Sequence, residues 1–180
     1  MLFKLFEGHL EIKENLIPEI EHRKKTGKIA FISFTFSNAS YLYLKNYIDS
    51  FRLLGYDKLY NGLNEPRHRE GSGCSAFGVS FLELINVLDP EFGREWSRDL
   101  SIANKLIGGE ITGRRVVLGK VIFSFRWAKD KSQHTHLKLY HPELIYSWIQ
   151  KKYVQLQKNP MIHYSTSTNR LVRGLIVDCR

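Results

Sequence analysis

The stretch EGSGCSAFGVSFLELINVL, residues 70–88, places a cysteine between a glycine-rich turn and an amphipathic run. Apolar residues recur in this run at the spacing of one helix face, and Asp89-Pro90 ends the pattern. The sequence therefore predicts a helix that begins at Cys74. A helix N-terminus stabilises a thiolate through its partial positive charge and unpaired backbone N–H groups, which makes Cys74 a candidate nucleophile. The alternative is a small buried residue at a corner of the fold.

Two further elements are predicted upstream of this helix. KIAFISFTF, residues 28–36, is rich in β-branched and aromatic side chains and predicts a strand. Ser37 or Asn38 then caps a predicted helix whose broad apolar stripe ends at Gly55. A strand and a helix therefore precede the cysteine along the chain.

The other segments give less distinct patterns. GHLEIK alternates like a half-buried strand, and Pro18 with a glycine-ended tail favours an extended segment and a turn. Residues 163–180 give no pattern that we can assign. We expect a strand over 8–13, an extended segment over 14–27, a short helix over 96–109, a strand over 114–128, an exposed loop around 134–136 and a final helix over 141–159.

The chain of 180 residues carries 27 Lys and Arg against 18 Asp and Glu, a formal net charge of +9. Such an excess favours acidic partners: nucleic acid, anionic membrane surfaces or acidic polymers. The basic residues are scattered, and no known nucleic-acid motif accompanies HRKK, RHR or GRR. The charge therefore leaves open a noncatalytic basic binding module but selects no partner for it.

The positions of the cysteines and histidines, together with the hydropathy of the chain, limit the kinds of site and of protein that the sequence can form. Cys74 and Cys179 are too few for a disulfide scaffold or a four-cysteine zinc site. His134 and His136, with His141 nearby, form a feasible pair of metal ligands without a second cluster, so we expect no metal and no cofactor. No run approaches the ~20 apolar residues of a membrane helix. We expect a cytoplasmic protein if the chain is complete and a bacterial envelope protein if a leader was trimmed; the oligomeric state stays open.

The order of the predicted strands, helix and cysteine along the chain resembles that of a known superfamily. A strand bearing GH, a further strand, a helix and the tyrosine-containing loop YDKLYNG precede a cysteine that opens a helix and has an aromatic residue three positions later. This order resembles the circularly permuted papain-like thiol hydrolases, which include lecithin retinol acyltransferase relatives and NlpC-type cell-wall peptidases of bacteria. The resemblance covers Gly8 to Leu88 and implies Cys74 as nucleophile and His9 as general base. Relatives often carry asparagine immediately before the cysteine, where this chain has Gly73.

Other site residues follow from the same resemblance. His22 lies on the segment where relatives carry the residue that orients the catalytic histidine, and Glu21 is a second candidate for that role. The alternative for both is an exposed surface residue without a catalytic role. The backbone N–H groups of Cys74 and Ser75 can hold a developing oxyanion. Tyr60 is either a group near that oxyanion or an anchor in the core.

These observations predict an α+β fold with a small, mostly antiparallel sheet packed against helices. Residues 1–90 would form the permuted papain-like core, and residues 91–180 a C-terminal extension packed on the same domain. The expected activity is that of a cysteine-dependent hydrolase or acyltransferase, which cleaves an amide or ester bond through a thioacyl-enzyme. The substrate, whether peptide, amide or lipid ester, stays open because pocket shape decides it.

Overall fold

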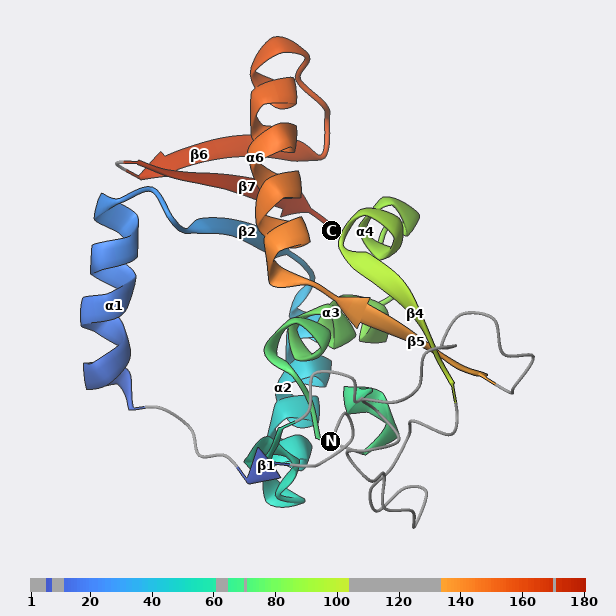
Figure 1. Cartoon of the computed structure of the whole chain (residues 1–180). Coiled ribbons are helices and arrows are strands. Elements are labelled where there is room, and N and C mark those ends of the chain that lie inside the picture. The colour runs from blue at the N-terminus through green and yellow to red at the C-terminus, as the bar shows by residue number, and fades with distance from the viewer. Residues whose placement is uncertain (1–5, 8–11, 61–64, 70, 104–133, 170) are drawn as a thin grey trace, which may run out of the picture.

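Helices and small β-sheets make up the computed structural model, which describes residues 6–7, 12–60, 65–69, 71–103, 134–169 and 171–180 (Figure 1). This arrangement confirms the predicted α+β class. The central sheet has three strands in the order β2–β7–β6, formed by Ala30–Thr35, Val172–Asp178 and Tyr164–Asn169. β2 runs parallel to β7, and β6 runs antiparallel to it.

Two further strand pairs lie outside the central sheet. β1 (Phe6–Glu7) pairs with β3 (Leu59–Tyr60), and β4 (Ser97–Ala103) pairs with β5 (His134–Tyr140). Both pairs are antiparallel, so β2–β7 is the only parallel pair among the residues that the structure describes. The helices are α1 (Lys13–Lys25), α2 (Asn38–Leu53), α3 (Cys74–Leu84), α4 (Pro90–Glu95) and α6 (Pro142–Lys158), with 3-10 turns η1 (Tyr56–Lys58) and η2 (Pro66–His68).

Three helices begin where the sequence predicts. The Ser37 hydroxyl caps α2 by accepting a hydrogen bond from the backbone N–H of Ser40, at 3.2 Å. α3 begins at Cys74, and the N–H of Phe77 closes its first turn on the carbonyl of Gly73 at 2.9 Å. α6 begins at Pro142, a residue that needs no intrahelical partner for its nitrogen at this position. Local capping and periodicity therefore decide these boundaries.

The extended segment predicted over residues 14–27 is wrong, because these residues form most of α1. Pro18 lies inside the helix, where it removes one backbone hydrogen bond. Good helix formers surround it, and ion pairs join Glu19 to Arg23 and Glu21 to Lys24 across one turn. The local proline signal was therefore outweighed by the rest of the segment.

Two predictions beyond α3 also need correction. Residues 97–103 form strand β4 instead of a helix, because their alternating side chains pair with β5 along its whole length. Residues 134–136 lie in β5 instead of an exposed loop. Asp89 caps α4 by accepting from the N–H of Glu91 at 2.7 Å, so Asp89-Pro90 starts a helix after α3 has ended. The strand predicted over 114–128, residues 104–109 of the predicted helix and residues 8–11 of the strand predicted over 8–13 lie outside the described residues. The prediction is wrong for residues 12 and 13, which are the N-cap and the first residue of α1.

The buried core joins α3, α4 and α6 to the central sheet. Phe92 is 1% exposed and stacks on Trp96, with 4.3 Å between ring centroids, while Trp148 meets both rings edge-on. Leu175 of β7 is fully buried beneath them. The elements on either side of residue 90 therefore share one core and one sheet.

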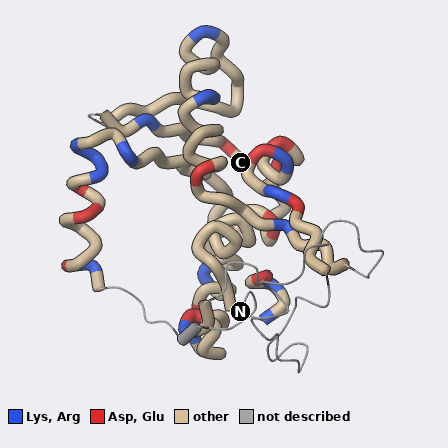
Figure 2. The backbone as a smooth tube through the Cα atoms, viewed as in Figure 1, with Lys and Arg blue, Asp and Glu red and all other residues tan. Residues whose placement is uncertain are grey.

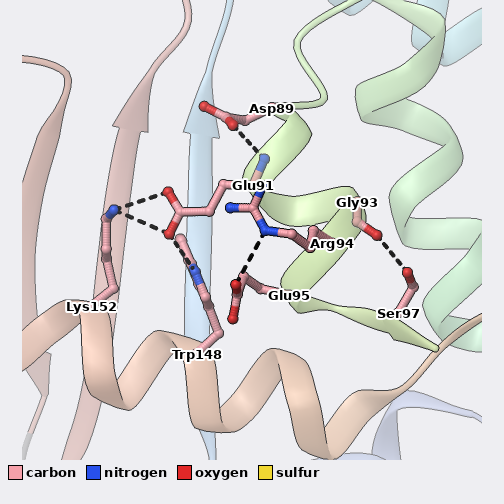
Figure 3. Close-up of polar contacts among 8 residues, drawn as sticks. All are labelled: Asp89, Glu91, Gly93, Arg94, Glu95, Ser97, Trp148 and Lys152. Atoms are coloured by element: carbon pink, nitrogen blue, oxygen red, sulfur yellow. Dashed lines mark hydrogen bonds and ion pairs between the residues drawn. The ribbon is translucent and has the colours of Figure 1, made fainter.

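A polar cluster is built into this core between α4 and α6 (Figure 3). Lys152 is 6% exposed, and its Nζ lies 3.1 Å from Oε2 of Glu91. The indole Nε1 of Trp148 donates to the other carboxylate oxygen at 3.0 Å. The Lys152 ammonium also lies 5.3 Å from the ring centroid of Tyr164, within reach of a cation–π contact. The cluster ties α4 to α6 through groups that are costly to leave unpaired.

Candidate functional site

The thiol of Cys74 is exposed at the first residue of α3. It borders a cavity of about 480 Å³ between α2, η1, β3 and the start of α3. Most of the walls are apolar or aromatic. The lining residues are Ile48, Phe51, Arg52, Tyr56, Asp57, Leu59, Tyr60, Ser72, Gly73, Cys74 and Phe77. We call this space the Cys74 cavity.

Aromatic packing between α2 and α3 builds one wall of the Cys74 cavity. The rings of Phe51 and Phe77 lie 4.9 Å apart, and Phe51 also meets Tyr56 edge-on at 5.6 Å. Phe51 is 6% exposed, so this wall is part of the packed structure. A rigid wall of this kind can hold an apolar group beside the thiol.

The turn before Cys74 is fixed to β3. The N–H of Ser72 donates to the carbonyl of Leu59 at 3.1 Å. Gly71 has φ of +79°, and a Cβ at this position would overlap the backbone of Leu59. The predicted glycine-rich turn therefore needs glycine at position 71 both for its conformation and for the close approach of the two chains.

Tyr60 and Ser75 occupy different places around the thiol. Tyr60 is 49% exposed and lines the Cys74 cavity from β3. Ser75 lines a second apolar cavity, of about 450 Å³, between β2, α2 and α3. The Ser75 side chain therefore faces away from the Cys74 cavity, although its backbone N–H belongs to the first turn of α3, whose N–H groups have no intrahelical acceptor.

Of the two predicted histidines, only His22 belongs to the described residues. His9 lies outside the described residues; β1, which pairs with β3, ends two residues before it in the sequence. His22 is exposed on α1, and Glu21 on the same helix pairs with Lys24. Figure 1 shows α1 well separated from α3, so the structure does not bring His22 to the thiol.

Asp57 is a residue of the Cys74 cavity that the sequence did not single out. Its Oδ1 is buried and has no hydrogen-bond partner, as is true of few atoms in the described part of the chain. Arg52 lines the same cavity, and no ion pair within 4.0 Å joins it to Asp57 among the described residues. The only advance signal was the position of Asp57 in YDKLYNG, three residues before Tyr60.

The other polar candidates show no comparable arrangement. Nδ1 of His136 lies 3.3 Å from the hydroxyl of Ser101 across the β4–β5 pair, on an exposed face. Within the described ranges, no group of three or more His, Cys, Asp or Glu side chains lies close enough to hold a metal ion. Cys74 and Cys179 are both free thiols. Burial and the neighbouring Asp178 raise the pKa of Cys179.

The charged side chains are dispersed. Figure 2 shows Lys and Arg positions spread over helices and strands, with Asp and Glu among them. In α1, α2 and α4, basic and acidic residues form local ion pairs. None of the helices that the structure describes is both long and apolar enough to cross a bilayer.

Comparison with known protein families, with curated proteins and with solved structures found no match to this chain. The candidate site therefore rests on the sequence and on the geometry described above.

Proposed function

We propose that the chain is a cysteine-dependent hydrolase or acyltransferase, with Cys74 as its nucleophile on a permuted papain-like core. One observation carries the proposal: the exposed Cys74 thiol stands at the first residue of α3 and borders an apolar cavity of about 480 Å³. A buried residue at a corner, the alternative for Cys74, would be shielded from solvent. An accessible thiol beside a substrate-sized cavity is what a nucleophile needs.

The position of Cys74 at the start of α3 also supports the proposed function through its electrostatics. The N-terminus of an eleven-residue helix carries partial positive charge, which stabilises an oxyanion that develops beside it. The backbone N–H groups of Cys74 and Ser75 belong to that first turn. Tyr60 of β3 lines the same cavity, and its hydroxyl is a further candidate donor.

His9 is the proposed general base, because the resemblance assigns the histidine of the GH pair to this role. The pairing of β1 with β3 supports the proposal, since β3 carries Tyr60 and β1 leads directly into GH. Asp57 replaces His22 as the better candidate for a polar residue beside the reacting groups, because Asp57 lines the Cys74 cavity.

The proposed reaction is an ordinary acyl transfer through a thioester. His9 takes the proton of Cys74, and the thiolate adds to the amide or ester carbonyl. The tetrahedral oxyanion collapses, the C–N or C–O bond breaks, and the protonated His9 gives its proton to the leaving amine or alcohol. Water, deprotonated by His9, then adds to the thioester and releases the carboxylic acid together with the Cys74 thiol. An alcohol or amine in place of water makes the enzyme an acyltransferase.

Site-specific alkylation tests the proposal. Cys179 is the matched internal control, because its raised pKa makes it a slow thiol. We expect iodoacetamide at pH 6.5 to modify Cys74 at least about tenfold faster than Cys179, and His9→Ala to remove most of that advantage. His22→Ala, on α1, should leave it unchanged. Equal rates for Cys74 in wild type and His9→Ala would contradict the assigned base.

Substrate turnover is the second measurement that tests the proposal. A panel of fluorogenic amides, peptides and lipid esters should be cleaved by wild type and by Cys179→Ser, but not by Cys74→Ala. Intact mass spectrometry should detect an acyl adduct on Cys74 during turnover. A Cys74→Ala protein with the wild-type rate would overturn the proposal.

A further inference from the structure

Arg52 places a positive charge on the largely apolar wall of the Cys74 cavity. It lies in the last turn of α2, is exposed, and lines the cavity together with Cys74. Within the described part of the chain, no hydrogen bond or ion pair joins its guanidinium to another residue. The five N–H donors of the guanidinium are therefore open to solvent or to a ligand.

Asp57 is the other charged residue in the lining, and it offers no equivalent site for a cation. Its Oδ1 is buried with essentially no accessible surface, so a ligand does not reach this oxygen. No ion pair joins Asp57 to Arg52 in the described structure. The charge of Arg52 is therefore not neutralised by a direct contact, and it repels a cationic group that enters the cavity.

The apolar walls add a second requirement. Ile48, Phe51, Leu59 and Phe77 line the cavity with aliphatic and aromatic surface. Such walls favour a bulky apolar group, because contact with them removes apolar surface from water. Low-dielectric walls also reduce the screening of a nearby charge, so Arg52 acts more strongly on a ligand here than a fully solvated arginine would.

We infer that Arg52 determines substrate specificity by binding a carboxylate of the substrate, beside a bulky apolar group that packs on Phe51 and Phe77. This inference rests on the function proposed above and narrows its substrate class. A guanidinium binds a carboxylate through two parallel, charge-assisted hydrogen bonds. The substrate is then an amide or ester that combines an apolar group with a carboxylate. Substrates with an ammonium group in that place are disfavoured.

Three N-benzyl chloroacetamides test the role of Arg52. They carry a carboxylate, an aminomethyl or a methyl group in the para position, and they are compared in a Cys179→Ser background, so that alkylation reports Cys74 alone. The Cys74 thiolate displaces chloride and forms a thioether, which intact mass spectrometry counts. Each rate constant is divided by that of the same reagent with N-acetylcysteine amide, an uncharged thiol, which removes the intrinsic difference in reactivity.

We expect the carboxylate reagent to be favoured over the aminomethyl reagent by at least about tenfold in wild type. Arg52→Gln should bring this ratio close to one, and Arg52→Lys should retain part of it, because an ammonium keeps the charge without the bidentate geometry. Lys45→Gln is the matched control. It removes one positive charge from the same helix, but Lys45 pairs with Asp49 at 2.8 Å and lines no part of this cavity. That variant should keep the full ratio, which separates the effect of Arg52 from that of overall charge.

The apolar requirement has its own comparison. The para-methyl benzyl reagent should alkylate Cys74 at least about tenfold faster than N-methyl chloroacetamide, after the same normalisation. Ile48→Ala should reduce this preference because it removes part of the wall. Leu53→Ala is the control, since Leu53 is 88% exposed on α2 and does not line the cavity. Equal rates for the two reagents in wild type would contradict the apolar part of the inference.

The outcomes separate this inference from the proposed function. A carboxylate-to-aminomethyl ratio near one in wild type, or an unchanged ratio in Arg52→Gln, overturns the role of Arg52, while fast alkylation by all benzyl reagents still supports a catalytic Cys74. Alkylation by every reagent no faster than that of the free thiol overturns the proposed function as well. A test on wild type alone avoids folding effects. 4-Methylbenzoate should protect Cys74 from iodoacetamide, and equal protection by 4-methylbenzylamine contradicts the inference.

Discussion

The backbone N–H of Ser72 donates to the carbonyl of Leu59 at 3.1 Å, and this bond anchors the turn before Cys74 to β3. β3 also carries Tyr60, which lines the Cys74 cavity. This backbone contact holds the turn before Cys74 against the strand that carries Tyr60, and both residues line the cavity. The contact is possible because Gly71, directly before Ser72, has no Cβ to separate the two chains.

Gly71→Ala should therefore damage both stability and the site. A side chain at φ of +79° is strained, and its Cβ would overlap the Leu59 backbone, so the turn must move. We expect a loss of about 2 kcal/mol in the free energy of unfolding, measured by urea denaturation. The rate of Cys74 alkylation by iodoacetamide should fall at least about tenfold, because a small displacement disrupts positioning.

Gly78→Ala is the matched control for Gly71→Ala. Gly78 lies within α3, and a Cβ there meets no atom within 4 Å. Alanine favours a helix interior by about 1 kcal/mol over glycine, so this variant should be more stable and should keep wild-type alkylation. Destabilisation by both substitutions to the same extent would show that the Leu59 contact has no special role.

Tyr60→Phe should slow acylation without changing the fold. The ring remains, but the hydroxyl that can donate to an oxyanion at the Cys74 cavity is lost. We expect kcat/KM to fall about tenfold, mainly through kcat, because the lost bond forms in the transition state. Tyr41→Phe is the control, since Tyr41 is similarly exposed, at 53%, and lines no part of this cavity. An effect confined to KM would favour ground-state substrate packing as the role of Tyr60.

The sequence predicted elements whose signals are local. α2, α3 and α6 each combine an apolar stripe with a recognisable start, so their positions follow from residues within one or two turns. α1 was missed because Pro18 is a strong local breaker whose effect depends on its surroundings. The C-terminal strands β6 and β7 could not be placed, because β7 pairs in parallel with β2, more than 130 residues earlier.

The residues of the candidate site also differ in whether a local sequence pattern could reveal them. Cys74 was proposed because a cysteine at a predicted helix start has a chemical meaning on its own. Tyr60 was proposed from its place in the order of elements. Asp57 was not proposed, since an aspartate in a polar loop is ordinary until the structure shows that its Oδ1 is buried and that the residue lines the same cavity as Cys74. Burial of a single polar atom is a tertiary property that no local pattern encodes.

The parallel pairing of β2 with β7 predicts strong coupling between Phe31 and Gly174. These residues are direct partners in the register, and a Cβ at Gly174 would overlap the Phe31 ring. Gly174→Ala should therefore cost about 1–3 kcal/mol of stability. Phe31→Ala should relieve that overlap, so the double variant should be at least about 1 kcal/mol more stable than the sum of the single effects.

A pair without contact serves as the control for this double-mutant cycle. Phe36 lies beyond the end of β2, and combining Phe36→Ala with Gly174→Ala should give additive effects. Urea denaturation of the variants, followed by tryptophan fluorescence, measures each free energy of unfolding. Additivity for Phe31 as well would argue against the β2–β7 register that joins the two halves of the chain.

Glu91→Gln should weaken the polar cluster between α4 and α6 in a pH-dependent way. The substitution keeps an acceptor for Trp148 but leaves the Lys152 ammonium buried without a counter-charge. Removing one partner of a fully buried ion pair lowers the free energy of unfolding by about 3–5 kcal/mol. We expect a smaller loss for Glu91→Gln, about 2 kcal/mol, because the Glu91 side chain is 33% exposed. Glu95→Gln, whose partner is the neighbouring exposed Arg94, should cost less than about 0.5 kcal/mol.

The sign of the pH dependence follows from the carboxyl group of Glu91. Partial burial works to raise its pKa, but hydrogen bonds from Trp148 and Lys152 outweigh burial and lower the pKa in the folded state. Its contribution is therefore fully present above the unfolded pKa of about 4.3 and is lost as pH falls through the lower folded value. The stability difference between wild type and Glu91→Gln should be large at pH 7 and shrink below pH 4. The pKa of Asp178 is also lowered, by hydrogen bonds from Arg180, but both proteins carry this residue and its contribution cancels in the difference. A difference that stayed constant from pH 7 to pH 3 would mean that the charge of Glu91 does not stabilise the fold.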